Sequence, residues 1–219
     1  MRTSSAIMAV CCFLAIGAQA QGFKFSNPTP EAQADAAEQA QRQAVTAIHL
    51  SEPCRDRIRN RKIMVLFAQE VNGMPMANQG SYSRQVEAVN TRLRAVGLKT
   101  YTAEEIRRQI AQEEVDAYFK NNPDRALSAA RRLAAQYVLR GVIATSAVAN
   151  PMVYVNQVSV QLDFTLTDSA GRPISVARAS NQSYAGADVA GMALTLIEER
   201  ADEVVARLYS DYCRNADLR

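Results

Sequence analysis

One strictly alternating stretch constrains the fold of this chain more than any other feature. From Val158 to Leu166 every even position is apolar, and every odd position between them is polar. Such period-two alternation is typical of a strand with one buried and one solvated face. Residues 168–171 (DSAG) then predict a tight turn, and residues 172–176 predict the start of a return strand. We therefore expect an antiparallel hairpin.

The residues just before this stretch have the opposite parity. Val153 and Val155 are apolar at odd positions, whereas the strand that follows is apolar at even ones. Because side chains alternate between the faces of a sheet, the change of parity predicts a bulge or a break at Asn156 and Gln157.

Strands and helices alternate along the rest of the chain. The apolar runs 62–67 and 137–144 predict strands that are covered on both faces. Apolar residues at helical spacing and suitable capping residues predict helices at 84–95, 103–119, 124–136 and 189–212. The expected fold is a single α/β domain with a mixed sheet packed by helices. Parallel crossovers form its first half and the antiparallel hairpin its second.

The N-terminal residues have the composition of a targeting segment. Arg2 supplies a positive charge, residues 6–16 are apolar, and the small residues Ala18 and Ala20 frame a cleavage site before Gln21. The sequence thus predicts a signal peptide at residues 1–20 and a mature protein in the periplasm or outside the cell.

This segment has two other interpretations. A membrane anchor needs about 20 apolar residues, and the apolar run at 6–16 is shorter. We therefore expect no transmembrane segment after cleavage. A lipid on Cys11 or Cys12 is the second alternative, although the residues before Cys11 match a lipoprotein signal poorly.

The domain organisation follows from composition. After the signal peptide, residues 21–52 form an arm rich in Ala and Gln, interpreted either as a solvated spacer helix or as a partner-binding segment. Residues 53–213 form the α/β domain, and residues 214–219 form a C-terminal tail.

Cleavage at Ala20 would leave two cysteines, Cys54 and Cys213. In an oxidising compartment two cysteines near opposite ends of a domain are more often paired than free. A disulfide between them closes a loop of roughly 160 residues, which the chain-entropy model values at about 4–5 kcal/mol. We expect this disulfide in the mature protein.

The charge of the chain is nearly balanced. Lys and Arg number 25, against 22 for Asp and Glu, which gives no argument for a nucleic-acid partner. Basic residues gather at 55–62, where they could meet phosphate or lipid headgroups. The favoured interpretation is a solvated lead-in to the first buried strand.

The chain lacks the motifs of familiar catalytic sites. His49 is the single histidine, and no GxSxG, HExxH or phosphate-binding glycine loop is present. Adjacent glutamates such as Glu104 and Glu105 point in different directions around a helix and do not converge. The sequence therefore predicts no catalytic residue, no metal site and no cofactor, and we expect a protein that is not an enzyme.

Residues 134–143 (AAQYVLRGVI) and 160–174 (VQLDFTLTDSAGRPI) resemble a group of envelope proteins. Their fold is like the N-terminal domain of TolB, and they include the lipoprotein activator LpoB, the curli secretion protein CsgG and the flagellar protein FlgT. The resemblance implies a non-enzymatic envelope component: an activator, a ring subunit or an assembly factor. Many members of the group are lipoproteins, whereas we expect this chain to be cleaved at Ala20. The chain has a single long hairpin, which argues against a pore.

Two functions follow from these observations. The first is an exported interaction, assembly or activator component that binds another envelope protein or a second copy of itself. The alternative is a periplasmic module that binds or hydrolyses cell-wall glycan or a small ligand. For the first function we expect the contact at an edge strand of the hairpin, at Ser159, Gln161 and Thr165.

Overall fold

The computed structural model describes residues 29–77, 80, 82–120, 122–152 and 155–215. The expected signal peptide at 1–20, with Cys11 and Cys12, lies outside the described residues. The chain divides into two units, residues 1–37 and 38–219. The described part of the first unit contains the start of helix α1, and everything below concerns the second unit.

The helices and strands have the following bounds. The helices are α1 (Pro30–Leu50), α2 (Arg55–Ile58), α3 (Ser83–Ala95), α4 (Ala103–Gln109), α5 (Gln112–Phe119), α6 (Pro123–Arg132) and α7 (Val189–Asn215). The strands are β1 (Lys62–Val71), β2 (Met74–Met76), β3 (Lys99–Thr100), β4 (Tyr137–Asn150), β5 (Val155–Asp168) and β6 (Pro173–Ala185).

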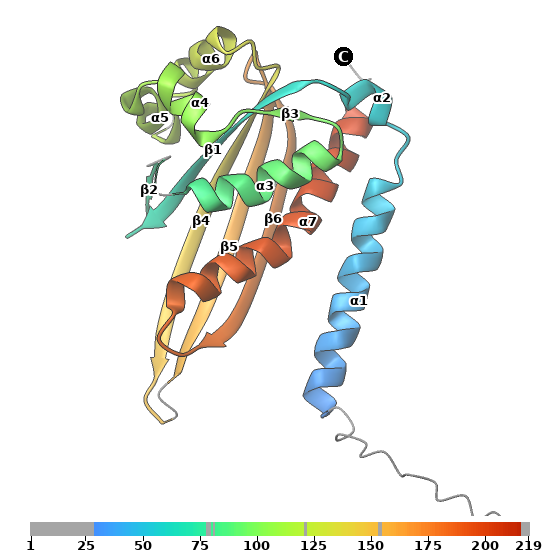
Figure 1. Cartoon of the computed structure of the whole chain (residues 1–219), viewed down its shortest axis with the longest axis vertical. Helices are drawn as coiled ribbons and strands as arrows, with labels where there is room; N and C mark the ends of the chain where they lie inside the picture. Colours follow the sequence, from blue (N-terminus) through green and yellow to red (C-terminus); the bar gives the residue numbers. More distant parts are fainter. Residues whose placement is uncertain (1–28, 78–79, 81, 121, 153–154, 216–219) are drawn as a thin grey trace, which may run out of the picture. The chain divides into compact units, whose positions relative to one another are not determined.

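The strands form one mixed sheet in the order β2-β1-β4-β5-β6, and β3 pairs with β1 off this path. Strand β1 is parallel to β3 and to β4. The other pairs, including the β5–β6 hairpin, are antiparallel. The expected α/β fold with a mixed sheet is therefore confirmed (Figure 1).

Strand β1 is buried on both faces, as its continuous apolar sequence predicts. Ile63, Val65 and Phe67 pack into a core formed with α3 and α7. Met64 and Leu66 point to the opposite face, where they pack against α4, α5 and α6. The two helical layers lie on opposite faces of this part of the sheet.

Strands β5 and β6 are covered on one face. The even positions of β5, such as Val158 and Phe164, pack into the core beneath α7. In Figure 1 α3 and α7 cross the same face of the strands. The opposite face of β5 and β6 carries exposed or half-exposed side chains. We call it the open face. It includes Ser159, Gln161 and Asp163 of β5 and Arg178, Ser180 and Gln182 of β6.

The expected bulge at Asn156 and Gln157 is wrong. Both residues pair in unbroken register with β4 and with β6, and the irregularity in the β5–β6 ladder lies between Leu166 and Thr167. No change of register is needed because Val155, next to the turn that joins β4 to β5, lies half-exposed on the open face.

The single helix expected at 103–119 is divided into α4 and α5. Ile110 has an extended backbone (φ −126°, ψ 123°), and its side chain is buried. The N–H of Ala111 then donates to the carboxylate of Glu114 at 3.3 Å, which helps a new helix to begin. Burial of Ile110 thus interrupts a segment with good helix-forming residues.

Candidate functional site

The sheet ends in a free edge at β6. Within the described part of the chain, β6 pairs with β5 on one side and with no strand on the other. The edge is 13 residues long, which exceeds the usual strand of about 5 or 6 residues. A row of unpaired backbone N–H and C=O groups along such an edge is a template for another chain.

The residues expected at this edge lie elsewhere. Ser159, Gln161 and Thr165 belong to β5, which is an interior strand between β4 and β6. Ser159, for example, faces Ser146 on one side and Gln182 on the other. The expectation was wrong because β6 continues to Ala185 and covers β5 along almost its whole length.

These three side chains instead occupy the middle of the open face. Gln161 is exposed there, and its side-chain amide donates to Asp163 at 3.0 Å. Ser159 and Thr165 are half-exposed. Their backbone groups face neighbouring strands on both sides, so these residues can offer a partner side chains but no unpaired strand.

The true edge strand has few of the features that protect edges. Proline stands at its first position, Pro173, and residues 174–185 contain one charged side chain, Arg178. Natural edge strands are protected by charges, prolines or bulges. The Nε of Arg178 lies 2.6 Å from Asp163 Oδ1 on the adjacent strand, so this charge is already paired.

Two exposed apolar side chains stand on the same edge strand. Val176 retains 46% of its exposed area and Tyr184 retains 63%. The sequence predicts the start of the return strand at residues 172–176, and neither Arg178 nor Tyr184 is among the residues expected to bind a partner. The signal that could have found them is the continued alternation of small apolar Ala177 and Ala179 with polar neighbours.

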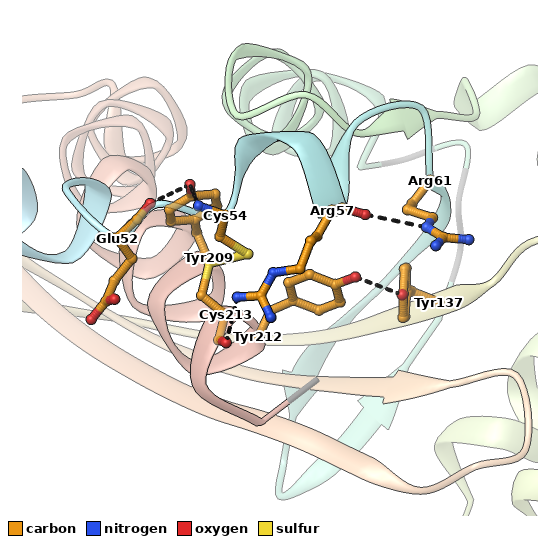
Figure 2. The surroundings of a disulfide bond; sticks show 8 residues. All are labelled: Glu52, Cys54, Arg57, Arg61, Tyr137, Tyr209, Tyr212 and Cys213. Atoms are coloured by element: carbon orange, nitrogen blue, oxygen red, sulfur yellow. Dashed lines mark hydrogen bonds between the residues drawn. A yellow bond between two sulfur atoms is a disulfide. The ribbon is translucent and has the colours of Figure 1, made fainter. Parts of the chain in front are cut away.

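A disulfide lies near the C-terminal end of α7. Cys54 and Cys213 are joined, with their Cα atoms 5.5 Å apart. The hydroxyl of Tyr209 donates to the carbonyl of Glu52 at 2.8 Å and accepts the N–H of Cys54 at 3.3 Å (Figure 2). These bonds fix the C-terminal end of α7 to the segment that leads into β1.

Two arginines of the basic run at 55–62 stabilise the junction between the C-terminal end of α7 and the segment before β1. Arg57 donates to the carbonyl of Cys213 at 2.9 Å, and Arg61 donates to the carbonyl of Arg57 at 3.3 Å (Figure 2). A cation beside the last carbonyls of a helix stabilises the helix end. The basic residues therefore have a structural role here.

A pocket of about 420 Å³ opens beside the junction. Its lining consists of Asp56, Arg57, Arg59, Asn60, Arg61, Gln136 and Tyr212. The hydroxyls of Tyr137 and Tyr212 are 3.0 Å apart. Burial, and next the hydrogen bond to Tyr212, raise the pKa of Tyr137 well above its usual value. Tyr137 is thus a neutral group at ordinary pH and offers no base.

A second pocket, of about 330 Å³, lies among β1, β4, α3 and α7. It is lined by Gln69, Tyr82, Gln85, Ile143, Thr145, Val189, Ala190, Ala193 and Ile197. The lining combines amide and hydroxyl groups with apolar side chains, which suits binding of a small polar molecule. The described lining residues include no carboxylate, imidazole or thiol, so they offer no pair for acid–base hydrolysis.

Two further kinds of site are absent from the described residues. No group of three or more His, Cys, Asp and Glu side chains is placed to hold a metal ion in that part of the chain. Among the helices described, none combines the length and the apolar character needed to cross a membrane.

Comparison with known proteins gave structural likenesses alone. No family model matches the chain, and no curated protein matches it. The PelC dodecamer from Paraburkholderia phytofirmans is similar to it with 18% identity and a TM-score of 0.41, over 68% of this chain and 90% of that chain. A lipoprotein from Neisseria meningitidis follows with 15% identity and a TM-score of 0.40, over 62% and 93%.

The C-terminal domain of LpoB from Salmonella enterica is similar with 17% identity and a TM-score of 0.34, over 64% of this chain and 95% of that chain. LpoB belongs to the group that the sequence resembles, whereas the TolB-like assignment itself stays a prediction. Likenesses at these identities and TM-scores assign no function to the chain.

Proposed function

We propose that this chain is an exported, non-enzymatic component of the cell envelope that acts by binding another protein through the free edge of β6. Its role is that of an interaction, assembly or activator component. The observation that carries the proposal is the 13-residue edge strand, which has a single charged residue after Pro173. An extended segment of a partner can add to such an edge as a further strand.

Two features support the proposed compartment. The pattern of residues 1–20 supports export and cleavage before Gln21. The disulfide between Cys54 and Cys213 fits an oxidising compartment such as the periplasm. In this proposal the α/β domain at 53–213 binds the partner, and the arm at 21–52 links it to the processed N-terminus.

Site-specific photo-crosslinking tests the proposal. A photoreactive amino acid replaces Gln182, which is exposed on β6, or Arg107, which is exposed on α4 and serves as the matched control. The full chain is irradiated in intact cells, and the products are identified by mass spectrometry. We expect a discrete crosslinked protein from position 182 and none from position 107. Equal products from both positions, or none from position 182, would contradict the proposal.

The second pocket supports one alternative, a module that binds cell-wall glycan or a small ligand. Gln69, Gln85 and Thr145 give this pocket hydrogen-bonding groups that suit a sugar. Soluble cell-wall fragments would then raise the thermal midpoint of the protein, and Gln85→Ala would reduce the shift. An unchanged midpoint at millimolar fragment concentrations would exclude this alternative.

A further inference from the structure

The exposed side chains of β6 are arranged symmetrically about Ser180. We propose that the partner at this edge is a second copy of the chain, whose β6 pairs antiparallel with β6 about a two-fold axis at Ser180. The inference rests on the proposed function because it names the occupant of the same edge. It follows from three features: the side-chain spacing, the backbone direction and the distribution of charge.

The side-chain spacing favours this register. Val176 and Tyr184 lie four residues on either side of Ser180, and all three are exposed. In a symmetric antiparallel pair, Val176 of each copy faces Tyr184 of the other. The interface therefore contains two equivalent Val176–Tyr184 contacts. Pairs of an aromatic and a β-branched residue are among the favourable cross-strand contacts.

Neighbouring registers lose this match. An axis at Ala179 places Val176 opposite Gln182, and an axis at Asn181 places Arg178 opposite Tyr184. An axis between two residues would join side chains of opposite faces, which the alternation of a strand forbids. Among these registers, the axis at Ser180 alone pairs both exposed apolar residues.

The backbone at Ser180 points toward the free edge. The N–H of Gln182 donates to the side-chain oxygen of Asn181 at 3.1 Å, so it is turned away from β5. Backbone groups along a strand alternate between its two neighbours, and Ser180 therefore has the same direction as Gln182. About the proposed axis the two Ser180 residues exchange N–H···O=C bonds, with their Cα atoms about 5.5 Å apart.

The charge on β6 is compatible with this symmetric pairing. Arg178, the charged residue of positions 174–185, faces Gln182 of the other copy in this register. Its own ion pair with Asp163, on the neighbouring strand, can remain in place. No two like charges of β6 meet across the axis, and such a meeting would disfavour association.

Cysteine crosslinking of the full chain tests the register. Cys54 and Cys213 are already joined. In the proposed dimer, Ser180→Cys adds a thiol that faces the same thiol of the second copy. Under mild oxidation we expect Ser180→Cys to form at least tenfold more disulfide-linked dimer than Gln161→Cys, which lies on the same face one strand inward. The unsubstituted chain gives the background from all native cysteines.

Mixed samples sharpen the test. Arg178→Cys and Gln182→Cys should crosslink with each other when mixed, and neither should crosslink efficiently with itself. Equal dimer formation by Ser180→Cys and Gln161→Cys would overturn the register.

A charge exchange gives a second test that does not depend on thiols. Val176→Glu and Tyr184→Lys should each weaken dimerisation at least tenfold in sedimentation equilibrium. The double variant should recover most of the loss, because the introduced carboxylate of each copy would face the introduced ammonium group of the other across the axis. Circular dichroism melting confirms that each variant is folded. Failure of the double variant to recover, with all three proteins folded, would contradict the pairing.

Failure of this inference can be distinguished from failure of the proposed function. If the chain is a monomer at 100 µM and Ser180→Cys forms no dimer, self-pairing is overturned. Photo-crosslinking at Gln182 to a different envelope protein would then leave the proposed function standing. If Gln182 also gives no crosslink, both are overturned.

Discussion

The two sides of the sheet, at β1 and at β6, differ in how far other strands and helices cover them. On the outer side of β1, β3 pairs with Lys62 and Ile63, and β2 pairs with residues 69–71. The strand itself is buried on both faces by helices. At the opposite edge β6 offers 13 residues, with one face open and no strand beside it among the described residues. The difference favours β1 as the main source of stability, and it supports the proposal that association takes place at β6.

The largest expected effect concerns the covalent link between these two regions. The disulfide joins the segment before β1 to the helix that follows β6. Replacing both Cys54 and Cys213 by serine should lower the free energy of unfolding by about 4–5 kcal/mol, because the unfolded chain loses a long closed loop. Urea unfolding of the variant and the oxidised parent measures the difference. A loss below about 1 kcal/mol would show that the link contributes little.

A matched pair of aromatic truncations compares the two strands directly. Phe67 of β1 is completely buried, whereas Tyr184 of β6 retains 63% of its exposed area. Phe67→Ala should cost about 3–5 kcal/mol of unfolding free energy. In dilute, monomeric protein, Tyr184→Ala should change it by less than about 0.5 kcal/mol. Similar losses from both variants would remove the distinction between a structural and a free edge.

Close packing beside β1 predicts a smaller loss. A Cβ added to Gly141 of β4 would lie 2.7 Å from the Phe67 ring and 2.8 Å from the Phe164 ring. These two rings already pack edge to face, with centroids 5.5 Å apart. Gly141→Ala should therefore destabilise the protein by about 1–3 kcal/mol through overpacking. An unchanged thermal midpoint would mean that the rings can move aside freely.

The smallest effect belongs to the ion pair on the open face. Arg178 and Asp163 are substantially exposed, at 73% and 36% of their side-chain area. Exposed ion pairs contribute about 0.2–1 kcal/mol. A double-mutant cycle with Arg178→Ala and Asp163→Ala should give a coupling energy in this range, and it should fall in high salt. A coupling above about 2 kcal/mol would indicate that the open face is covered in solution.

Local sequence patterns predicted those helices and strands that have a signal within their own residues. The alternation at 158–166 gave β5, and Thr102 with Glu105 gave the capping box that starts α4. The apolar runs gave β1 and the first half of β4. For the strands the pattern reflects burial of their own side chains, and for α4 it reflects local hydrogen bonds between Thr102 and Glu105.

The far halves of β4 and β6 could not be predicted in this way. Residues 145–150 and 177–185 are mostly small or polar, and they become strands because they pair with β5 in register. Strand order is likewise a property of the whole sheet. The edge was therefore assigned to Ser159, Gln161 and Thr165 of β5 instead of to β6, and the exposed Tyr184 was missed.

Amide hydrogen exchange at Ser180 tests the central claim most directly. In dilute protein its N–H is unpaired at the edge and should exchange quickly, whereas the N–H of Gln161 on the interior strand β5 is the protected control. As the protein concentration rises toward 100 µM, we predict that protection at Ser180 increases at least tenfold while Gln161 stays protected throughout. Fast exchange at Ser180 at every concentration, and equally after mixing with envelope extract, would contradict the claim that another chain pairs with β6.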